Sequence, residues 1–177
     1  HPMLQTRIIP SSGERLPVVG LGTWQAFDIA GERPEPDATH LAMQTEAAVA
    51  LQRFVELGGS LVDSSPMYGS AEQMLGTLAA RQSLHPKLFI ATKVWTSGRE
   101  AGIRQMEDSF RLMQTKTIDL MQVHNLLDLK VHLPVLRDWK KAGRIRYLGI
   151  THYHAGAHAE VEKLVKTGDF DFVQINY

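Results

Sequence analysis

Short apolar runs alternate with amphipathic stretches of helical period along most of this 177-residue chain. Strands are predicted at residues 18–22, 61–62, 88–94, 118–123, 147–150 and 172–177, and helices at 44–57, 71–82, 100–114, 131–142 and 154–166. Strands separated by helices need crossover connections, so we predict a parallel sheet covered by helices. Residues 6–19 precede this alternation and predict a β-hairpin. No linker divides these elements, and we expect residues 1–177 to form a single domain.

Two parallel architectures compete, an open doubly wound sheet and a closed barrel. Open nucleotide-binding sheets usually carry a glycine-rich fingerprint, but Gly20 and Gly22 lack the third glycine and lead into a loop. Polar residues at the ends of several successive strands favour the barrel. We therefore predict an α/β fold, a (β/α)8 TIM barrel with an N-terminal β-hairpin, with only about six strands in this chain. Because a full barrel needs eight strands and about 200 residues, we expect a further C-terminal part beyond Tyr177.

Composition excludes several classes of function. The formal net charge is zero, so no basic field favours nucleic acid or an anionic membrane. The absence of cysteine excludes disulfides, thiolate metal sites and cysteine nucleophiles. No apolar run reaches the roughly 18 residues of a membrane span. We expect a monomer with a small-molecule substrate. The cytoplasm is the default compartment, and a chain beginning at His1 is also compatible with leader cleavage and a periplasmic location.

Three residues that can handle protons end three apolar strand-like runs, and a fourth lies close by. Asp63, Lys93 and His124 each end such a run, and Tyr68 follows Asp63 after a short turn. Each residue taken alone has an ordinary structural explanation. An aspartate is common in turns, and a lysine in an apolar strand can extend its ammonium to solvent. A tyrosine can pack within a turn, and a lone histidine is often a hydrogen-bonded core residue. In a parallel barrel, however, the C-terminal strand ends converge on one mouth. Their joint occurrence at that mouth therefore predicts an active site.

Longer segments around these residues carry a resemblance to a known family. Residues 63–69 form an Asp-x4-Tyr-Gly motif, and residues 18–24, 91–95, 118–125, 143–150 and 173–177 extend the match in the same order. The chain resembles the aldo/keto reductases over its whole length. The resemblance implies a bacterial (β/α)8 barrel with a short hairpin that reduces aldehydes and ketones with NADPH, or alternatively with NADH.

The resemblance places a catalytic tetrad on Asp63, Tyr68, Lys93 and His124. Reduction of a carbonyl delivers a hydride to carbon and a proton to oxygen. A free phenol, with a pKa of about 10, is a poor acid at neutral pH, and a nearby ammonium favours its phenolate. We therefore expect Lys93 to make Tyr68 the general acid. Asp63 would hold Lys93 charged, and His124 would donate to the substrate oxygen.

Further residues of the mouth are expected to bind the cofactor and the substrate. The cofactor-binding residues implied by the resemblance are Gly22, Thr23, Trp24, Asp63, Thr151, His152 and Gln174. The expected substrate pocket is lined by Trp24, Trp95 and Tyr153. The family usually has Ser-Asn where this chain has Thr151 and His152. The segment that binds the pyrophosphate lies beyond Tyr177 in the family, so we expect a chain ending there to be inactive.

Two other classes of function remain open. A metal-dependent hydrolase on a similar barrel is suggested by His152 and His154, and by the i, i+4 spacing of His154 and His158. No glutamate accompanies that pair as it does in zincins, and we expect no metal site. The third class is a nucleotide-binding regulatory module on the reductase fold. We expect the remaining histidines to lie on the surface or in loops, namely His1, His40, His85 and His132.

Overall fold

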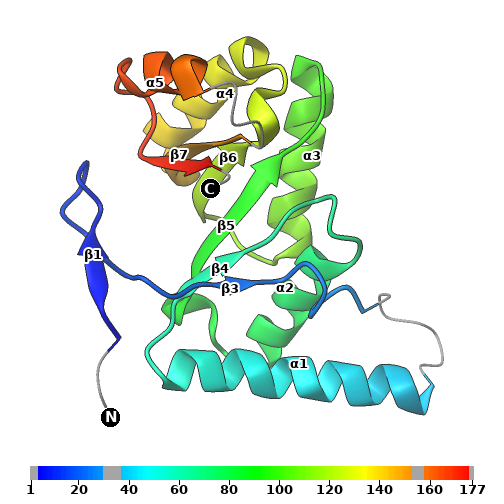
Figure 1. Cartoon of the computed structure of the whole chain (residues 1–177). Helices are drawn as coiled ribbons and strands as arrows, with labels where there is room; N and C mark the ends of the chain where they lie inside the picture. Colours follow the sequence, from blue (N-terminus) through cyan, green and yellow to red (C-terminus); the bar gives the residue numbers. More distant parts are fainter. Residues whose placement is uncertain (1–3, 30–36, 153–157, 176–177) are drawn as a thin grey trace.

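A computed structural model of the chain describes residues 4–29, 37–152 and 158–175 and is organised around one parallel sheet (Figure 1). The sheet contains, in this order, β3 (Leu21–Gly22), β4 (Leu61–Asp63), β5 (Phe89–Val94), β6 (Ile118–Val123), β7 (Ile145–His152) and β8 (Phe172–Ile175). Each strand pairs in parallel with the next strand along the chain. Strand order therefore follows chain order, and the sheet curls into a half-barrel. The predicted parallel fold class is confirmed.

Helices connect successive strands and pack in a row along one face of the sheet (Figure 1). They are α1 (Ala38–Glu56), α2 (Ala71–Arg81), α3 (Arg99–Leu112), α4 (Leu129–Lys141) and α5 (His158–Val165). Among the described residues, none of these helices is both long and apolar enough to cross a membrane. The sequence-based positions of the first four helices agree with these bounds to within two residues, except at the start of α1.

The start of α1 differs from the sequence prediction. The helix begins at Ala38 rather than Gln44, because the Asp37 carboxylate accepts a hydrogen bond of 2.8 Å from the backbone N–H of His40. This N-cap adds nearly two turns to the helix. The His40 side chain is buried, so the sequence prediction of a surface or loop position is wrong for it.

The spacing of Ser70 and Gln73 in the sequence predicts a capping box at the start of α2, but the structure uses a different cap. Ser70 makes no side-chain capping bond within the helix. Its hydroxyl instead donates to the Ile29 carbonyl at 2.5 Å, and its backbone N–H donates to the Asp28 carboxylate at 3.0 Å. The predicted capping box of Ser70 and Gln73 is therefore wrong. The segment after β3 caps α2 instead, and this ties that segment to the turn that carries Tyr68.

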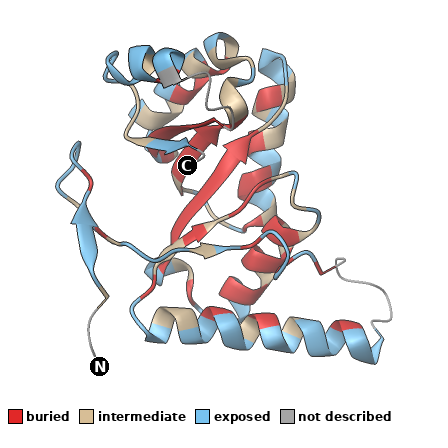
Figure 2. Cartoon of the chain, viewed as in Figure 1, coloured by how far each residue is buried: buried red, intermediate tan, exposed pale blue. Residues whose placement is uncertain are grey.

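Apolar side chains form separate clusters on the two faces of the sheet, and the central strands are the most deeply buried part of the chain (Figure 2). The larger cluster lies between the sheet and the helices and includes Leu51, Leu75 and Met121. The smaller cluster lies on the concave face and includes Phe89, Leu120 and Tyr147. The concave face is therefore packed at its lower end, which leaves the polar residues at the carboxyl ends of the strands above it.

The predicted N-terminal hairpin is confirmed and is joined to the lower end of the sheet by charged residues. β1 (Thr6–Ile8) pairs antiparallel with β2 (Arg15–Pro17), and Glu14 precedes β2. The Glu14 carboxylate accepts hydrogen bonds of 2.5 Å from both Arg146 and Tyr147. Arg146 also pairs with Asp119 at 2.8 Å. We call Glu14, Asp119, Arg146 and Tyr147 the floor network.

The floor network gives the fold a component of stability that depends on pH. Burial tends to raise the pKa of Glu14, but the bonds from Tyr147 and Arg146 outweigh it and hold the pKa below the ordinary 4.5. A carboxylate with a lowered pKa stabilises the fold above its unfolded pKa, and the stabilisation is lost as the pH falls through the folded pKa. The network therefore contributes at neutral pH and fails in acid.

We expect Glu14→Gln to lower the free energy of unfolding by about 1 kcal/mol at pH 7, because charge-assisted hydrogen bonds are replaced by neutral ones. Urea unfolding at pH 7 and at pH 3.5 measures the effect, and the difference from the wild type should shrink in acid. Glu160→Gln, at an exposed position of α5, is the matched control and should change little. An equal loss at both pH values would contradict the assignment.

Candidate active site

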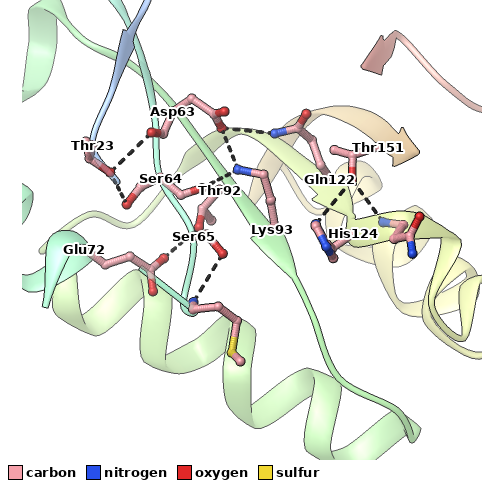
Figure 3. A network of polar contacts seen from close by, with 12 residues as sticks. Thr23, Asp63, Ser64, Ser65, Glu72, Thr92, Lys93, Gln122, His124 and Thr151 are labelled. Atoms are coloured by element: carbon pink, nitrogen blue, oxygen red, sulfur yellow. Dashed lines mark hydrogen bonds and ion pairs between the residues drawn. The ribbon is translucent and has the colours of Figure 1, made fainter. Parts of the chain in front are cut away.

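The polar residues predicted at the strand ends lie together on the concave face, at its carboxyl edge (Figure 3). Strand register explains their position. Lys93 on β5 is opposite Gln122 on β6, and Thr151 on β7 is opposite Gln174 on β8. Residues that are opposite each other in a sheet point to the same face, so residues far apart in sequence meet at one edge.

Lys93 is the centre of this group. Its side chain is only 1% exposed, and its ammonium donates to the Asp63 carboxylate at 3.1 Å and to the Ser64 carbonyl at 2.8 Å. The ammonium also lies 4.9 Å from the centre of the Tyr68 ring, over its face. A buried cation needs such partners because burial without them costs several kcal/mol, on the order of the desolvation penalty for an ion. The structure thus places both Asp63 and Tyr68 beside the Lys93 ammonium.

Gln122 is a second partner of Asp63 that sequence reasoning missed. Its side-chain amide donates to Asp63 Oδ1 at 3.3 Å, and the residue is 3% exposed. The neighbouring position on β7 is Gly149, where an added Cβ would lie 3.0 Å from Gln122 Cγ. Glycine at that position leaves room for the Gln122 side chain. The sequence signal was present, since Gln122 is a polar residue two positions before His124 in an apolar run.

The segments after β3 and β4 are fastened to each other beside Asp63. Thr23 is fully buried, and its backbone N–H donates to the Asp63 carbonyl at 3.1 Å. Its hydroxyl donates to Ser64 Oγ at 2.8 Å. Trp24 follows, 63% exposed, with its ring 6.3 Å from the Tyr68 ring between centres. Thr23 therefore joins the two segments through hydrogen bonds, whereas Trp24 lies at the solvent-exposed side of the mouth.

His124 lies on the opposite side of the mouth, against Trp95. The two rings are stacked with centres 3.3 Å apart and planes inclined by 23°. Thr151 Oγ1 lies 3.4 Å from His124 Nδ1 and accepts a bond of 3.0 Å from the Asn125 N–H. Burial, and secondly the positive charge of Lys93, lower the pKa of His124 from 6.5 to about 4. The imidazole is therefore neutral at physiological pH.

A buried carboxyl group lies behind the same strands, on the helix side of the sheet. Glu72 on α2 is 2% exposed and accepts a hydrogen bond of 2.7 Å from the Thr92 hydroxyl (Figure 3). Burial raises its pKa above the ordinary 4.5, although the bond from Thr92 and the charge of Lys93 oppose this. Glu72 thus ties α2 to the strand position next to Lys93.

The remaining residues that the sequence predicts to bind cofactor or substrate lie in different surroundings. Gln174 is exposed on β8 and borders a cavity of about 200 Å³ that Asp63 and Gln122 also line. His152 is 9% exposed at the end of β7. At Gly22, opposite Asp63, an added Cβ would meet no atom within 4 Å, so the backbone there borders open space. Tyr153 lies outside the described residues.

The histidines of the metal-site alternative fall mainly where the structure gives no description. His154 lies outside the described ranges, and the His158 side chain is not described either. Within residues 4–29, 37–152 and 158–175, no cluster of three metal-binding side chains is present. His132 is 1% exposed rather than on the surface, so the sequence prediction for it is wrong.

The buried ion pair predicts an asymmetry between two variants. Asp63→Leu leaves the ammonium of Lys93 buried with a carbonyl as its remaining acceptor. Lys93→Met leaves Asp63, which is 29% exposed and keeps the Gln122 amide. We expect Asp63→Leu to be the more destabilising change by about 1–2 kcal/mol in urea unfolding at pH 7. Arg53→Met, which breaks an exposed pair on α1, is the control and should cost under about 1 kcal/mol. Equal losses at Asp63 and Lys93 would contradict this account.

Comparison with known structures supports the half-barrel description. The chain aligns over 98% of its length with 58% of the holo form of an aldo-keto reductase from Bacillus halodurans, at 21% identity and a TM-score of 0.73. It also aligns over 81% of its length with 48% of an aldo/keto reductase from Klebsiella pneumoniae in complex with NADP and acetate, at 23% identity and a TM-score of 0.65. These similarities confirm the barrel fold.

Comparison with known sequences identifies the family. The methylglyoxal reductase YeaE of Escherichia coli is 36% identical over 126 residues, which cover 68% of this chain and 40% of that protein. The aldo-keto reductase YhdN of Bacillus subtilis is 26% identical over 160 residues, covering 82% of this chain and 46% of that protein. The chain thus spans less than half the length of either relative. The family model for the Aldo/keto reductase family matches residues 18–177, and the chain belongs to that family.

Proposed function

We propose that the protein reduces a small aldehyde or ketone to the alcohol with NADPH, with Tyr68 as the proton donor. The observation that carries the proposal is the buried Lys93 ammonium, held by Asp63 against the face of the Tyr68 ring. Methylglyoxal is the first substrate to test, because the relative with 36% identity bears the name methylglyoxal reductase.

Tyr68 and Lys93 together supply the proton. As negative charge develops on the carbonyl oxygen, the Tyr68 hydroxyl transfers its proton to that oxygen. The phenolate that remains is stabilised by the Lys93 ammonium, which lies 4.9 Å from the ring centre. Asp63 and the Ser64 carbonyl keep the ammonium in place by accepting two of its three hydrogens.

His124 orients the substrate as a neutral hydrogen-bond donor. Its lowered pKa of about 4 keeps the imidazole uncharged, so one ring nitrogen donates and the other accepts. Thr151 lies at the Nδ1 side, and its hydroxyl can donate there while its oxygen accepts from Asn125. In that arrangement Nε2 carries the hydrogen and donates to the substrate oxygen. Trp95 and Trp24 would form apolar walls on either side of the substrate.

The residues present fit the nicotinamide end of the cofactor. A carboxamide needs a donor and an acceptor, and the exposed side-chain amide of Gln174 offers both. Thr151, opposite Gln174 on the neighbouring strand, can accept from the carboxamide through its second lone pair while its hydroxyl hydrogen stays on His124 Nδ1. The open space beside Gly22 would accept part of the cofactor next to Asp63. When bound, the cofactor supplies the hydride that a carbonyl reduction requires.

The test is NADPH oxidation with methylglyoxal and other small aldehydes, measured on the protein as its natural host makes it. We expect Tyr68→Phe to lower kcat by about 10²- to 10⁴-fold, because the general acid is lost, with unchanged NADPH affinity. Tyr147→Phe, a matched change in the floor network, should retain turnover. Activity within tenfold of the wild type in Tyr68→Phe would overturn the role of Tyr68.

Other outcomes of the same assay identify the alternative functions. Tight NADPH binding without turnover of any aldehyde would favour the nucleotide-binding regulatory module. Stoichiometric zinc in the purified protein, without NADPH oxidation, would favour the hydrolase. Activity that is indifferent to chelation and abolished by Tyr68→Phe is the result expected for the proposed reductase.

A further inference from the structure

The backbone of Trp95 is hydrogen-bonded to a side-chain amide that lies outside the pocket. The β5–β6 ladder ends at the Val94–Val123 pair, and Trp95 is the next residue of the chain. Gln105 on α3 replaces that ladder. Its Oε1 accepts from Trp95 N at 2.6 Å, and its Nε2 donates to Trp95 O at 3.3 Å. One amide thus satisfies both backbone polar groups of a half-buried residue, as a neighbouring strand would.

A second helix holds the next residue of the same segment. His132 on α4 is 1% exposed and donates from Nε2 to the Thr96 carbonyl at 2.6 Å. The opposing position on α3 is Gly102, where an added Cβ would lie 2.6 Å from the His132 ring. Glycine therefore lets α3 and α4 approach closely enough for both anchors to act on residues 95–96.

The anchored segment determines what covers His124. The Trp95 ring lies on the imidazole at 3.3 Å between centres, and His124 is 4% exposed. Among the described residues, the charge that lowers the pKa of His124 is that of Lys93, which is itself paired with Asp63. Because the cover is a single flat ring on a backbone segment beyond the sheet, its position depends on the bonds that fix that backbone.

We propose that Gln105 is a positioning residue that holds Trp95 against His124 and thereby keeps water away from the imidazole. The proposal rests on the proposed function only for its effect on turnover; the stacking and its consequence for His124 stand without it. Gln105 acts through the backbone of Trp95 and does not touch the substrate. Releasing it should expose the imidazole to water and weaken the control of substrate orientation.

The decisive measurement is the pKa of His124, followed by NMR of the histidine ring protons, with the signal assigned by loss in His124→Gln. We expect Gln105→Met, which keeps side-chain length but removes both hydrogen bonds, to raise that pKa by about one unit or more towards the ordinary 6.5. Arg104→Met, at the neighbouring exposed position of α3, is the matched control and should leave it near 4. A pKa unchanged in Gln105→Met would overturn the proposal, even if stability falls.

A double-mutant cycle separates positioning through Trp95 from a general loss of packing. Trp95→Leu removes the cover itself and should raise the His124 pKa at least as far as Gln105→Met. Adding Gln105→Met to Trp95→Leu should then change little, and additive shifts would overturn the proposed route. Should Gln105→Met fail to fold, Gln105→Asn, with an amide too short to reach both groups, replaces it in the cycle.

The NMR result does not depend on turnover, so the two proposals fail separately. If Tyr68→Phe keeps activity while Gln105→Met raises the His124 pKa, the proposed function fails and the positioning role stands. In an active protein, we expect Gln105→Met to lower kcat/KM by about tenfold, the effect of weakening one substrate-orienting bond. The loss should appear without a change in NADPH affinity.

Discussion

A single buried positive charge determines the arrangement of the mouth. The Lys93 side chain is 1% exposed, and a cation in that position is tolerated only with close, well-directed acceptors. Asp63 supplies charge and Ser64 supplies a carbonyl, both from the end of the neighbouring strand. The β4–β5 register must therefore hold for the charge to be satisfied. A shift by one residue would turn Asp63 to the helix side and leave the ammonium without its counter-ion.

The surrounding structure supports that charge from both faces of the sheet. On the concave side, the Gln122 amide shares Asp63 and lies beside Gly149, which leaves it room. On the helix side, buried Glu72 bonds to Thr92, the residue before Lys93. Helices α3 and α4 then reach past the strand ends to hold the segment that carries Trp95. The helices that cover the sheet thus also fix residues of the mouth.

The sequence predicts the site residues that lie at the ends of strands. It does not predict the residues whose role depends on a hydrogen-bond partner elsewhere in the fold. Asp63, Lys93 and His124 each end an apolar run, and the topology of a parallel sheet brings such residues together. Gln105 lies on a helix with no local sign that its amide reaches Trp95. The sequence predicts a surface or loop position for His132, because a lone histidine in a helix reveals nothing of its carbonyl acceptor. Bonds of this kind depend on tertiary contacts that periodicity cannot show.

The boundaries that were wrong have the same origin. The sequence places the start of α1 at Gln44, because residues 27–39 contain four acidic residues and two prolines and predict a loop. The Asp37 carboxylate nevertheless caps the helix at that loop's end. At α2, the Ser70 and Gln73 pattern fitted a local cap, but Asp28 competes for the same backbone N–H from 42 residues away. Local patterns therefore predicted that these helices exist, and tertiary hydrogen bonds decided how they begin.

The charges of the mouth constrain which substrate groups can bind there. Lys93 is neutralised by Asp63, and the same positive charge helps to keep His124 from taking up a proton. A second cation beside the first would be buried without a counter-ion, which is more costly than a neutral imidazole. Tyr68 and His124 thus offer hydrogen-bond donors with little net charge. Such a surface suits an uncharged carbonyl group, whose oxygen becomes negative only as the reaction proceeds, and this is the substrate class that we propose.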